Sequence, residues 1–335
     1  MIKQYFPNLL IVVLLPILAC NTEQENSITS QPSVAENQQD VQIPAFSADS
    51  AYAFVAQQVA FGPRVPNSQA HLATADFLVS KLESYGGEVQ RQKFEAEAYD
   101  GSMLQLQNII ASFNPDQRKR ILLAAHWDTR PFADKDSERS QEPIDGANDG
   151  GSGVGILLET ARLMQQQTPD VGVDIIFFDG EDYGEPEGYE NSSESSNQVW
   201  WCLGSQHWSE NKHQKNYMAY YGILLDMVGA EGAKFYREGV SMRAAPSVVK
   251  KVWGQAQQLG HGRHFVYEDS PEIIDDHIYV NYNAKIPMID IVEYAPGTDA
   301  YFADYHHTHE DNMEIISKET LKAVGETVVN VIYRE

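Results

Sequence analysis

Cysteine is scarce in this 335-residue chain, which contains only Cys20 and Cys202. Two cysteines exclude a fold held together by several disulfides, and they exclude a zinc site built from a cluster of thiolates. Basic side chains are also few, since 24 Lys and Arg stand against 48 Asp and Glu, for a net charge of −24. Because nucleic acids are bound through clustered Lys and Arg, this balance argues against a nucleic-acid partner. No apolar run after the first 20 residues is long enough for a membrane-spanning helix.

The first 20 residues have the features of an export signal. Lys3 supplies positive charge, and Leu9 to Leu18 form an apolar core that is too short to span a bilayer comfortably. Cys20 stands where a bacterial lipoprotein box places its lipidated cysteine, and the alternative is an ordinary cleaved signal peptide. We therefore expect residues 1–20 to be a lipoprotein signal peptide. The mature protein is then exported, faces the periplasm, and is attached to the membrane only through its lipid.

Residues 21–44 are rich in Gln, Asn, Ser and Glu, with almost no aromatic side chain. Such a segment cannot bury enough apolar surface to offset the entropy lost on ordering, so we expect a flexible tether. Residues 45–335 contain no internal repeat, and their length is normal for a single α/β enzyme. The sequence therefore predicts one catalytic domain after the tether.

Apolar periodicity predicts strands that alternate with helices over this domain. Helical spacing predicts helices over 67–85, 150–166 and from an N-cap at Ser317 to the end of the chain. Apolar or alternating runs predict strands over 88–96, 106–113, 120–125, 171–178, 220–227 and 286–292. The strands 106–113 and 120–125 are expected to pair through a turn at 114–116. This alternation predicts an α/β fold with a mostly parallel central sheet and helices on both faces.

Acidic and histidine side chains lie at or beside the ends of these strands. In a mostly parallel sheet, sites form beyond the carboxyl ends of the strands. Taken singly, each cluster is typical of a hydrogen-bonded turn or a solvated surface, but five clusters near successive strand ends indicate one metal site. Imidazole and carboxylate are zinc ligands, although ligand type alone also admits Mn²⁺ or Co²⁺. The clusters are His126-Trp127-Asp128, Gly146 to Gly151, Asp179 to Asp182, Asp226, and His306 to Asp311.

The order of these clusters resembles the zinc exopeptidase family of bacterial aminopeptidases, whose fold is shared by animal-type glutaminyl-peptide cyclotransferases. The resemblance covers residues 50–335. Five stretches are similar to the cyclases in particular, and two more resemble the lipoprotein-like cyclases of Bacteroidetes-type bacteria. The five are Phe61-Gly62-Pro63-Arg64 with Pro66-Asn67-Ser68, Phe177 to Glu181, Leu225 to Ala230, Asp275-Asp276-His277-Ile278, and His307-Thr308, and the two are Trp201 to Gln206 and Phe235 to Gly239.

Carried over by matching positions, the resemblance implies a single Zn²⁺ held by Asp149, Asp182 and His307. Asp182 departs from the animal pattern, which has Glu there, and its shorter arm requires a nearer backbone. In two-metal aminopeptidases, the residues matching His126 and Asp226 hold a second ion and Asp149 bridges the pair. In the cyclases that second site is not occupied. The sequence leaves the occupancy open.

The implied reaction is the cyclisation of an N-terminal glutamine, in which the α-amine attacks the side-chain carboxamide and ammonia leaves. The resemblance implies zinc as a Lewis acid on the γ-carbonyl oxygen and Glu181 as the group that moves a proton from the amine to the ammonia. Asp226 and Asp276 share that proton through hydrogen bonds. Trp201 and His306 are the substrate-binding candidates, although Trp201 could equally belong to the core.

We therefore expect a zinc-dependent glutaminyl-peptide cyclotransferase that acts, as a monomer, on peptides or proteins with an N-terminal Gln. One alternative is a two-metal zinc aminopeptidase that uses Glu181 to activate water. The other is a catalytically silent lipoprotein that keeps the fold for binding. The cyclase-like stretches at 61–68 and 275–278 argue against the first alternative. Every position expected to hold a metal ligand carries a suitable side chain, with Asp in place of Glu at 182, and this argues against the second alternative.

Overall fold

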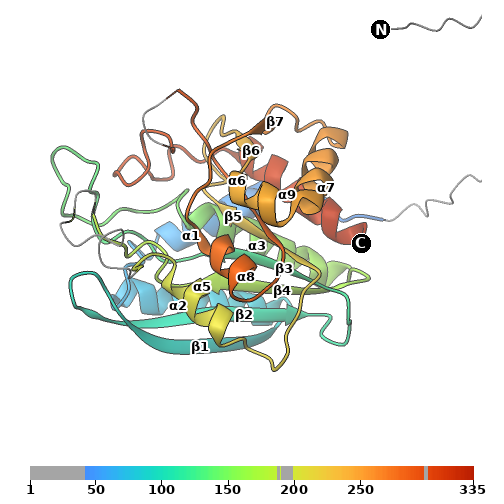
Figure 1. Cartoon of the computed structure of the whole chain (residues 1–335), viewed down its shortest axis with the longest axis horizontal. Helices are drawn as coiled ribbons and strands as arrows, with labels where there is room; N and C mark the ends of the chain where they lie inside the picture. Colours follow the sequence, from blue (N-terminus) through green and yellow to red (C-terminus); the bar gives the residue numbers. More distant parts are fainter. Residues whose placement is uncertain (1–41, 187–188, 190–198, 298–300) are drawn as a thin grey trace, which may run out of the picture. The chain divides into compact units, whose positions relative to one another are not determined.

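A computed structural model of the protein describes residues 42–186, 189, 199–297 and 301–335 (Figure 1). The predicted signal peptide and all but the end of the predicted tether lie outside these residues. Ile43, at the end of the predicted tether, packs against the main core, so the folded domain begins slightly before residue 45. Over the described residues, no helix has the length and apolar character needed to cross a membrane.

The central sheet has six strands in the order β1-β2-β4-β3-β5-β8. β4, β3, β5 and β8 run parallel, whereas β2 is antiparallel to both β1 and β4, so the predicted mostly parallel sheet is confirmed. Two further strands, β6 and β7, pair with each other in parallel. The strands are β1 (Glu88–Glu97), β2 (Met103–Phe113), β3 (Arg120–His126), β4 (Gly172–Phe178), β5 (Tyr221–Asp226), β6 (Phe235–Arg237), β7 (Phe265–Asp269) and β8 (Met288–Val292).

The predicted pairing of 106–113 with 120–125 is wrong. β4 lies between β2 and β3, with Ile109 of β2 opposite Phe177 and Leu123 of β3 opposite Ile175. Every residue of β4 is buried. A strand that is buried along its whole length is stable where both its faces and both its edges are covered, which is a central position in the sheet. The short connection between β2 and β3 therefore passes over β4 instead of forming a hairpin.

Helices cover both faces of the sheet, as the sequence predicts. Successive side chains of a strand point to opposite faces, so Ile109 of β2 belongs to the larger core and Ile110 to the smaller one. Helices α1, α2, α3, α7 and α9 contribute to the larger core, while Trp208 of α5 and Val280 of α8 lie in the smaller one. The helices are α1 (Ala48–Val59), α2 (Gln69–Ser84), α3 (Gly151–Gln166), α5 (Leu203–Glu210), α6 (Gly239–Ala244), α7 (Pro246–Gln258), α8 (Asp276–Tyr282) and α9 (Lys318–Tyr333).

The three predicted helices are confirmed as α2, α3 and α9. Ser317 caps α9 as expected, because its hydroxyl oxygen accepts a hydrogen bond from the backbone N of Glu319 at 3.2 Å. The sequence did not predict α1, α5, α6, α7, α8, β6 or β7. Most of these elements span too few residues to show a repeated apolar period, and their stability comes from the surfaces on which they pack.

Candidate active site

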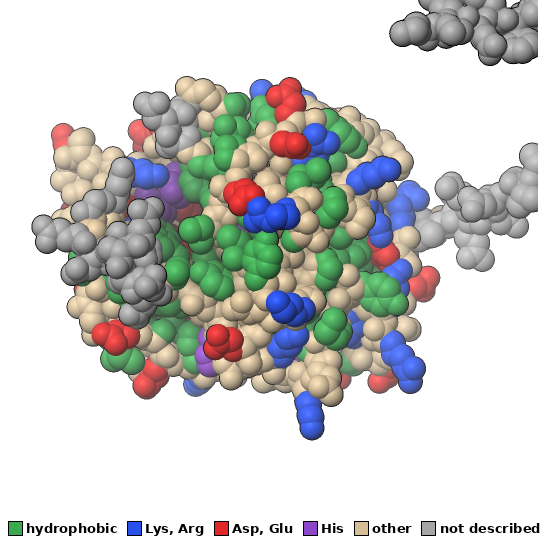
Figure 2. Space-filling model, viewed as in Figure 1, with side chains coloured by type: hydrophobic (Ala, Val, Ile, Leu, Met, Phe, Trp, Pro, Cys, Tyr) green, Lys and Arg blue, Asp and Glu red, His purple; other side chains and the backbone are tan. Residues whose placement is uncertain are grey.

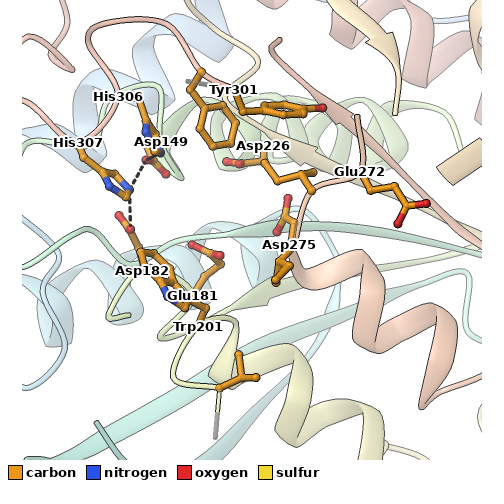
Figure 3. Close-up of a pocket in the computed structure, with 14 residues that line it drawn as sticks. Asp149, Glu181, Asp182, Trp201, Asp226, Glu272, Asp275, Tyr301, His306 and His307 are labelled. Atoms are coloured by element: carbon orange, nitrogen blue, oxygen red, sulfur yellow. Dashed lines mark ion pairs between the residues drawn. The ribbon is translucent and has the colours of Figure 1, made fainter. Parts of the chain in front are cut away.

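The carboxyl ends of the parallel strands meet at one edge of the sheet, as expected. β3 ends at His126, β5 ends at Asp226, and Asp179 to Asp182 directly follow β4. A cavity of about 430 Å³ opens at this edge (Figure 3), and Figure 2 shows histidine side chains in a hollow bordered by hydrophobic ones. The cavity is lined by Asp149, Glu181, Asp182, Val199, Trp201, Asp226, Glu272, Ile273, Ile274, Asp275, Tyr301, Phe302, His306 and His307.

Asp149 reaches this edge from the glycine-rich run before α3. Gly150 has a φ of +79°, and a Cβ at this position would lie 2.9 Å from the backbone O of Asp128, so only glycine fits. The carboxylate of Asp311 accepts hydrogen bonds from the backbone N of Asn148 at 2.7 Å and of Asp149 at 3.0 Å. These contacts hold Asp149 against the strand ends.

The three predicted metal ligands, Asp149, Asp182 and His307, converge on one side of the cavity. Nε2 of His307 lies 3.1 Å from Oδ1 of Asp182 and 3.8 Å from Oδ2 of Asp149 (Figure 3). Neither buried oxygen of Asp182 has a further hydrogen-bond partner among the described residues, although Nη1 of Arg130 lies 3.8 Å from Oδ1. Buried carboxylate oxygens are costly without a donor or a cation. The set of two carboxylates and one imidazole therefore fits a zinc ion with an open coordination position.

His307 is itself held in an unusual conformation. Its φ is +59°, in the left-handed region that side chains with a Cβ rarely adopt, and such strain is typical of functional sites. Its Nδ1 lies 3.5 Å from Oδ1 of Asp134. A carboxylate at that position orients the imidazole so that Nε2 faces the cavity.

A second group of donors shares Asp149. Nε2 of His126 lies 3.0 Å from Oδ1 of Asp149 and 3.2 Å from Oδ1 of Asp226. Burial raises the pKa of Asp226 to about 7, so this carboxyl is partly protonated near neutral pH. Burial also opposes ionisation of Asp149, but the hydrogen bond and charge of His126, with the two histidines beside it, hold the pKa of Asp149 below its usual range. This group can therefore either hold a second ion or share a proton.

Glu181 and Asp182 are adjacent but face different partners. The carboxylate of Asp128 accepts hydrogen bonds from both backbone amides, at 3.0 Å from N of Glu181 and 3.2 Å from N of Asp182. The side chain of Asp182 faces the other metal ligands, while that of Glu181 points into the cavity toward Asp275 (Figure 3). Burial raises the pKa of Glu181 well above its usual range, and the Asp275 and Asp182 carboxylates raise it further against the effect of His126. Such a carboxyl holds a proton more readily than an ordinary glutamate does, which suits a group that accepts and returns a proton during a reaction.

Of the acidic pair at 275–276, the residue that lines the cavity is Asp275, whereas the sequence analysis named Asp276. Asp276 is fully buried as the first residue of α8, and it is not among the residues that line the cavity. Asp275 is the N-cap of α8 and does line the cavity. An N-cap residue lies outside the helix, so its side chain stays available to the site, whereas the next side chain turns into the packed interior. Asp275 therefore lines the cavity beside Glu181, whereas Asp276 acts from the packed interior, where its charge also raises the pKa of Glu181.

Trp201, a predicted substrate-binding residue, lies on the cavity wall. Its ring is parallel to that of His307, with an interplanar angle of 3° and centroids 6.0 Å apart. The guanidinium of Arg130 lies 4.6 Å from the centre of the Trp201 ring. These contacts fix the indole while leaving it available to a ligand in the cavity.

His306, the other predicted substrate-binding residue, also lines the cavity. Its ring stacks on His307 with centroids 3.7 Å apart, and its Nδ1 lies 2.6 Å from Nζ of Lys135. Because a lysine ammonium can only donate, Nδ1 of His306 accepts and Nε2 carries the ring proton. Nε2 lies 3.8 Å from Oδ2 of Asp149 and so faces that carboxylate as a donor. His306 is therefore placed to interact with Asp149 or with substrate, and one of its ring nitrogens also lies within 4.8 Å of donor atoms of Asp149 and His307.

A buried glutamate supports the cavity wall that carries Asp275. The carboxylate of Glu238 accepts hydrogen bonds from the backbone N of Val240 at 2.7 Å and of Ile273 at 3.2 Å. It also lies 3.2 Å from Nε2 of His277. Burial opposes ionisation of Glu238, but His277 and the backbone amides outweigh it and lower its pKa to about 2. Glu238 therefore joins α6 to the wall and to α8.

The family relationship of the chain follows from a sequence model that spans the site. The model of peptidase family M28 matches residues 108–332, which is more than half of the chain and contains every residue predicted for the site. The chain belongs to peptidase family M28. The family name describes common ancestry and does not by itself fix the reaction that a member catalyses.

Two solved structures of bacterial proteins are similar to this M28 member over most of its length. A Zn-dependent exopeptidase from Parabacteroides distasonis is 52% identical, with a TM-score of 0.85, and the match covers 88% of this chain and 100% of that one. The glutaminyl cyclase of Tannerella forsythia is 51% identical, with a TM-score of 0.84, and the match covers 87% of this chain and 100% of that one. The predicted α/β zinc exopeptidase-like fold is thereby confirmed.

More distant relatives include both a cyclase and a peptidase. The glutaminyl-peptide cyclotransferase of Drosophila melanogaster is 23% identical over 282 residues, which are 77% of this chain and 73% of that protein. An aminopeptidase of Bacillus subtilis is 27% identical over 235 residues, which are 68% of this chain but 44% of that protein. The match to the aminopeptidase thus spans less than half of its length.

Several cavity residues escaped the sequence analysis. The wall formed by Ile273, Ile274, Tyr301 and Phe302 lies in loops, where no periodic pattern marks a residue as part of a site. Asp275 had a usable signal, because Asp is a preferred N-cap residue and the cap precedes the helix.

Proposed function

We propose that this M28 family member is a glutaminyl-peptide cyclotransferase, which converts the N-terminal Gln of peptides and proteins to pyroglutamate and releases ammonia. One observation carries the proposal: Glu181, a carboxyl with a raised pKa, faces the same cavity as Asp149, Asp182 and His307. The 51% identity to the Tannerella forsythia glutaminyl cyclase over that whole chain supports the same reaction.

Zinc is the metal that the donor set fits, and we propose one ion held by Asp149, Asp182 and His307. When bound, zinc would polarise the γ-carbonyl of the glutamine and stabilise the negative charge that develops on its oxygen. Asp134 orients His307 for this role through Nδ1, at 3.5 Å. His126 and Asp226 then remain a proton-sharing pair.

Glu181 carries the proton transfers. Its carboxylate accepts a proton from the α-amine while the amine nitrogen forms a bond to the γ-carbon. It returns that proton to the departing nitrogen, which leaves as ammonia when the bond between the γ-carbon and the amide nitrogen breaks. Asp275 lies beside Glu181, and Asp226 has a pKa of about 7, so both are suited to hold protons during the transfer.

Substrate positioning is the other task of the site, because both reacting groups belong to one glutamine. The side chain must fold back so that the amine meets its own carboxamide, and holding it there removes much of the entropic barrier. We assign this role to three side chains that line the cavity, those of Trp201, Phe302 and His306. These side chains would enclose the aliphatic part of the glutamine and exclude water.

A second candidate function is zinc aminopeptidase activity. The observation in its favour is the group of His126, Asp149 and Asp226, whose donor atoms lie within 4.8 Å of one another and could hold a second ion. In that reaction Glu181 would activate a water molecule against the peptide bond. The similarity to the Bacillus subtilis aminopeptidase supports this alternative.

The cellular setting is part of the proposal. We propose that residues 1–20 are a lipoprotein signal, that Cys20 carries the lipid, and that residues 21–44 tether a monomeric catalytic domain on the periplasmic side of a membrane. Radiolabelled fatty acid incorporation that is lost in Cys20→Ser would support the anchor. Unchanged labelling would contradict it.

Incubation with Gln-Xaa peptides followed by mass spectrometry tests the reaction. Cyclisation removes ammonia and leaves the peptide intact, whereas aminopeptidase activity releases the first residue. Glu181→Gln is the matched control, because it keeps the size of the side chain and removes the proton acceptor. Release of free glutamine by the wild type, with no pyroglutamyl product, would replace the cyclase proposal with the aminopeptidase.

A further inference from the structure

Cys202 lies directly against the proposed general base. Its Sγ is 3.2 Å from Oε1 of Glu181, and its backbone N donates a hydrogen bond to the backbone O of Glu181 at 3.0 Å. Cys202 is fully buried, and its φ of +57° lies in the left-handed region. The contacts with Glu181 therefore hold the thiol in one place, facing the base.

Asp275 completes a group of three possible metal ligands with Glu181 and Cys202. One donor atom from each of these side chains lies within 4.8 Å of the other two. Asp275 is only 4% exposed and lines the cavity. Its Oδ2 accepts no hydrogen bond from an N–H or O–H donor among the described residues, and the carboxyl of Asp290, with which Asp275 can share a proton, is its other neighbour. An unpartnered buried carboxylate oxygen beside a thiol and a second carboxylate is an arrangement that a cation would stabilise.

We propose that Glu181, Cys202 and Asp275 form an additional site for a thiophilic divalent metal ion, and that binding there inhibits the enzyme. The site is distinct from the one formed by the predicted zinc ligands, with which it shares no residue. Tetrahedral zinc with sulfur and oxygen ligands separates those ligand atoms by about 3.5 Å, given the usual bond lengths. The 3.2 Å between Sγ and Oε1 is close to that separation. Binding replaces the thiol proton, which leaves to solvent, so a thiolate and two carboxylates face the ion.

Inhibition follows from the identity of the ligands. A carboxylate of Glu181 that is bound to a metal ion is a much weaker base, because the charge of the ion opposes the uptake of a proton from the substrate amine. This consequence rests on the proposed cyclase function, but the binding of the metal does not. The open cavity gives ions in solution access to Glu181 and Asp275.

Cobalt(II) tests the site independently of activity, because a thiolate bound to Co²⁺ gives a charge-transfer band in the near ultraviolet. The full chain is first loaded with one equivalent of Zn²⁺ and then titrated with Co²⁺. We expect the band in the wild type and its loss in Cys202→Ser. Cys20→Ser is the matched control, since it removes the other cysteine of the chain and should leave the band unchanged.

Zinc inhibition provides the second measurement. Relative to the rate of each variant without added metal, the Zn²⁺ concentration for half-inhibition should rise at least about tenfold in Cys202→Ser, the loss expected on disturbing a metal site. If that variant folds poorly, Asp275→Asn keeps the thiol and should weaken Co²⁺ binding by a similar factor.

Two results would overturn the proposal: no thiolate band in the wild type at saturating Co²⁺, or a band that persists in Cys202→Ser. A protein that shows the band but forms no pyroglutamyl product would retain the metal site and lose only the cyclase function. The two proposals can therefore fail separately.

Discussion

Glu238 offers a quantitative test of how the cavity wall is held. The substitution Glu238→Gln keeps the size of the side chain but removes the charge that faces His277 and the backbone amides. The pKa of Glu238 is lowered to about 2, from an ordinary value of 4.5. At 1.36 kcal/mol for each unit, ionisation of this carboxyl contributes about 3 kcal/mol to the free energy of unfolding at pH 7.

The pH dependence of this contribution has a definite sign. A lowered pKa means that the stabilisation is fully present above pH 4.5 and is lost as the pH falls toward 2. The difference between wild type and Glu238→Gln should therefore shrink from about 3 kcal/mol at pH 7 to about 2 kcal/mol at pH 3.5. Urea unfolding followed by tryptophan fluorescence measures both values.

Glu272→Gln is the matched control for this experiment. Glu272 lies on the same wall, but its side chain is 54% exposed and pairs with an exposed arginine, so its replacement should change stability by less than about 1 kcal/mol. Equal stability of Glu238→Gln and wild type at pH 7 would refute the reasoning. A difference that grows as the pH falls would refute it as well.

Three further predictions concern the catalytic groups. Glu181→Gln should keep its zinc and lower the rate constant for cyclisation by roughly 10²–10⁴, whereas Asp182→Ala should lose zinc. Zinc analysis and kinetics on both variants test this, and loss of zinc from Glu181→Gln would mean that the two roles are reversed. His307→Ala should lose both zinc and activity, since only two protein ligands remain. Two tightly bound zinc ions per active wild-type chain would contradict the single-ion proposal. Asp275 raises the pKa of Glu181, so Asp275→Asn should lower that pKa and move the acid limb of the kcat/KM profile to lower pH. An acid limb at the same pH in the variant and the wild type would count against this coupling.

The sequence by itself determined the class of the fold and the location of the chemistry. Long apolar strands and helices of 16 residues carry their period in the chain, so α2, α3, α9 and most strands of the sheet could be predicted. The ends of parallel strands meet at one edge, so clusters such as Asp149 and Asp182 could be assigned to one site before their distances were known.

The tertiary structure decided what depends on packing between segments that are distant in the chain. Sequence order suggested that β2 pairs with β3, but the need to cover β4 on both edges places that strand between them. The choice between Asp275 and Asp276 depends on which side of a helix N-terminus faces the cavity, and both residues look alike in the sequence. The contact of Cys202 with Glu181 depends on how the start of α5 packs against the residues that follow β4, with Cys202 in a left-handed conformation, and no local pattern encodes that packing.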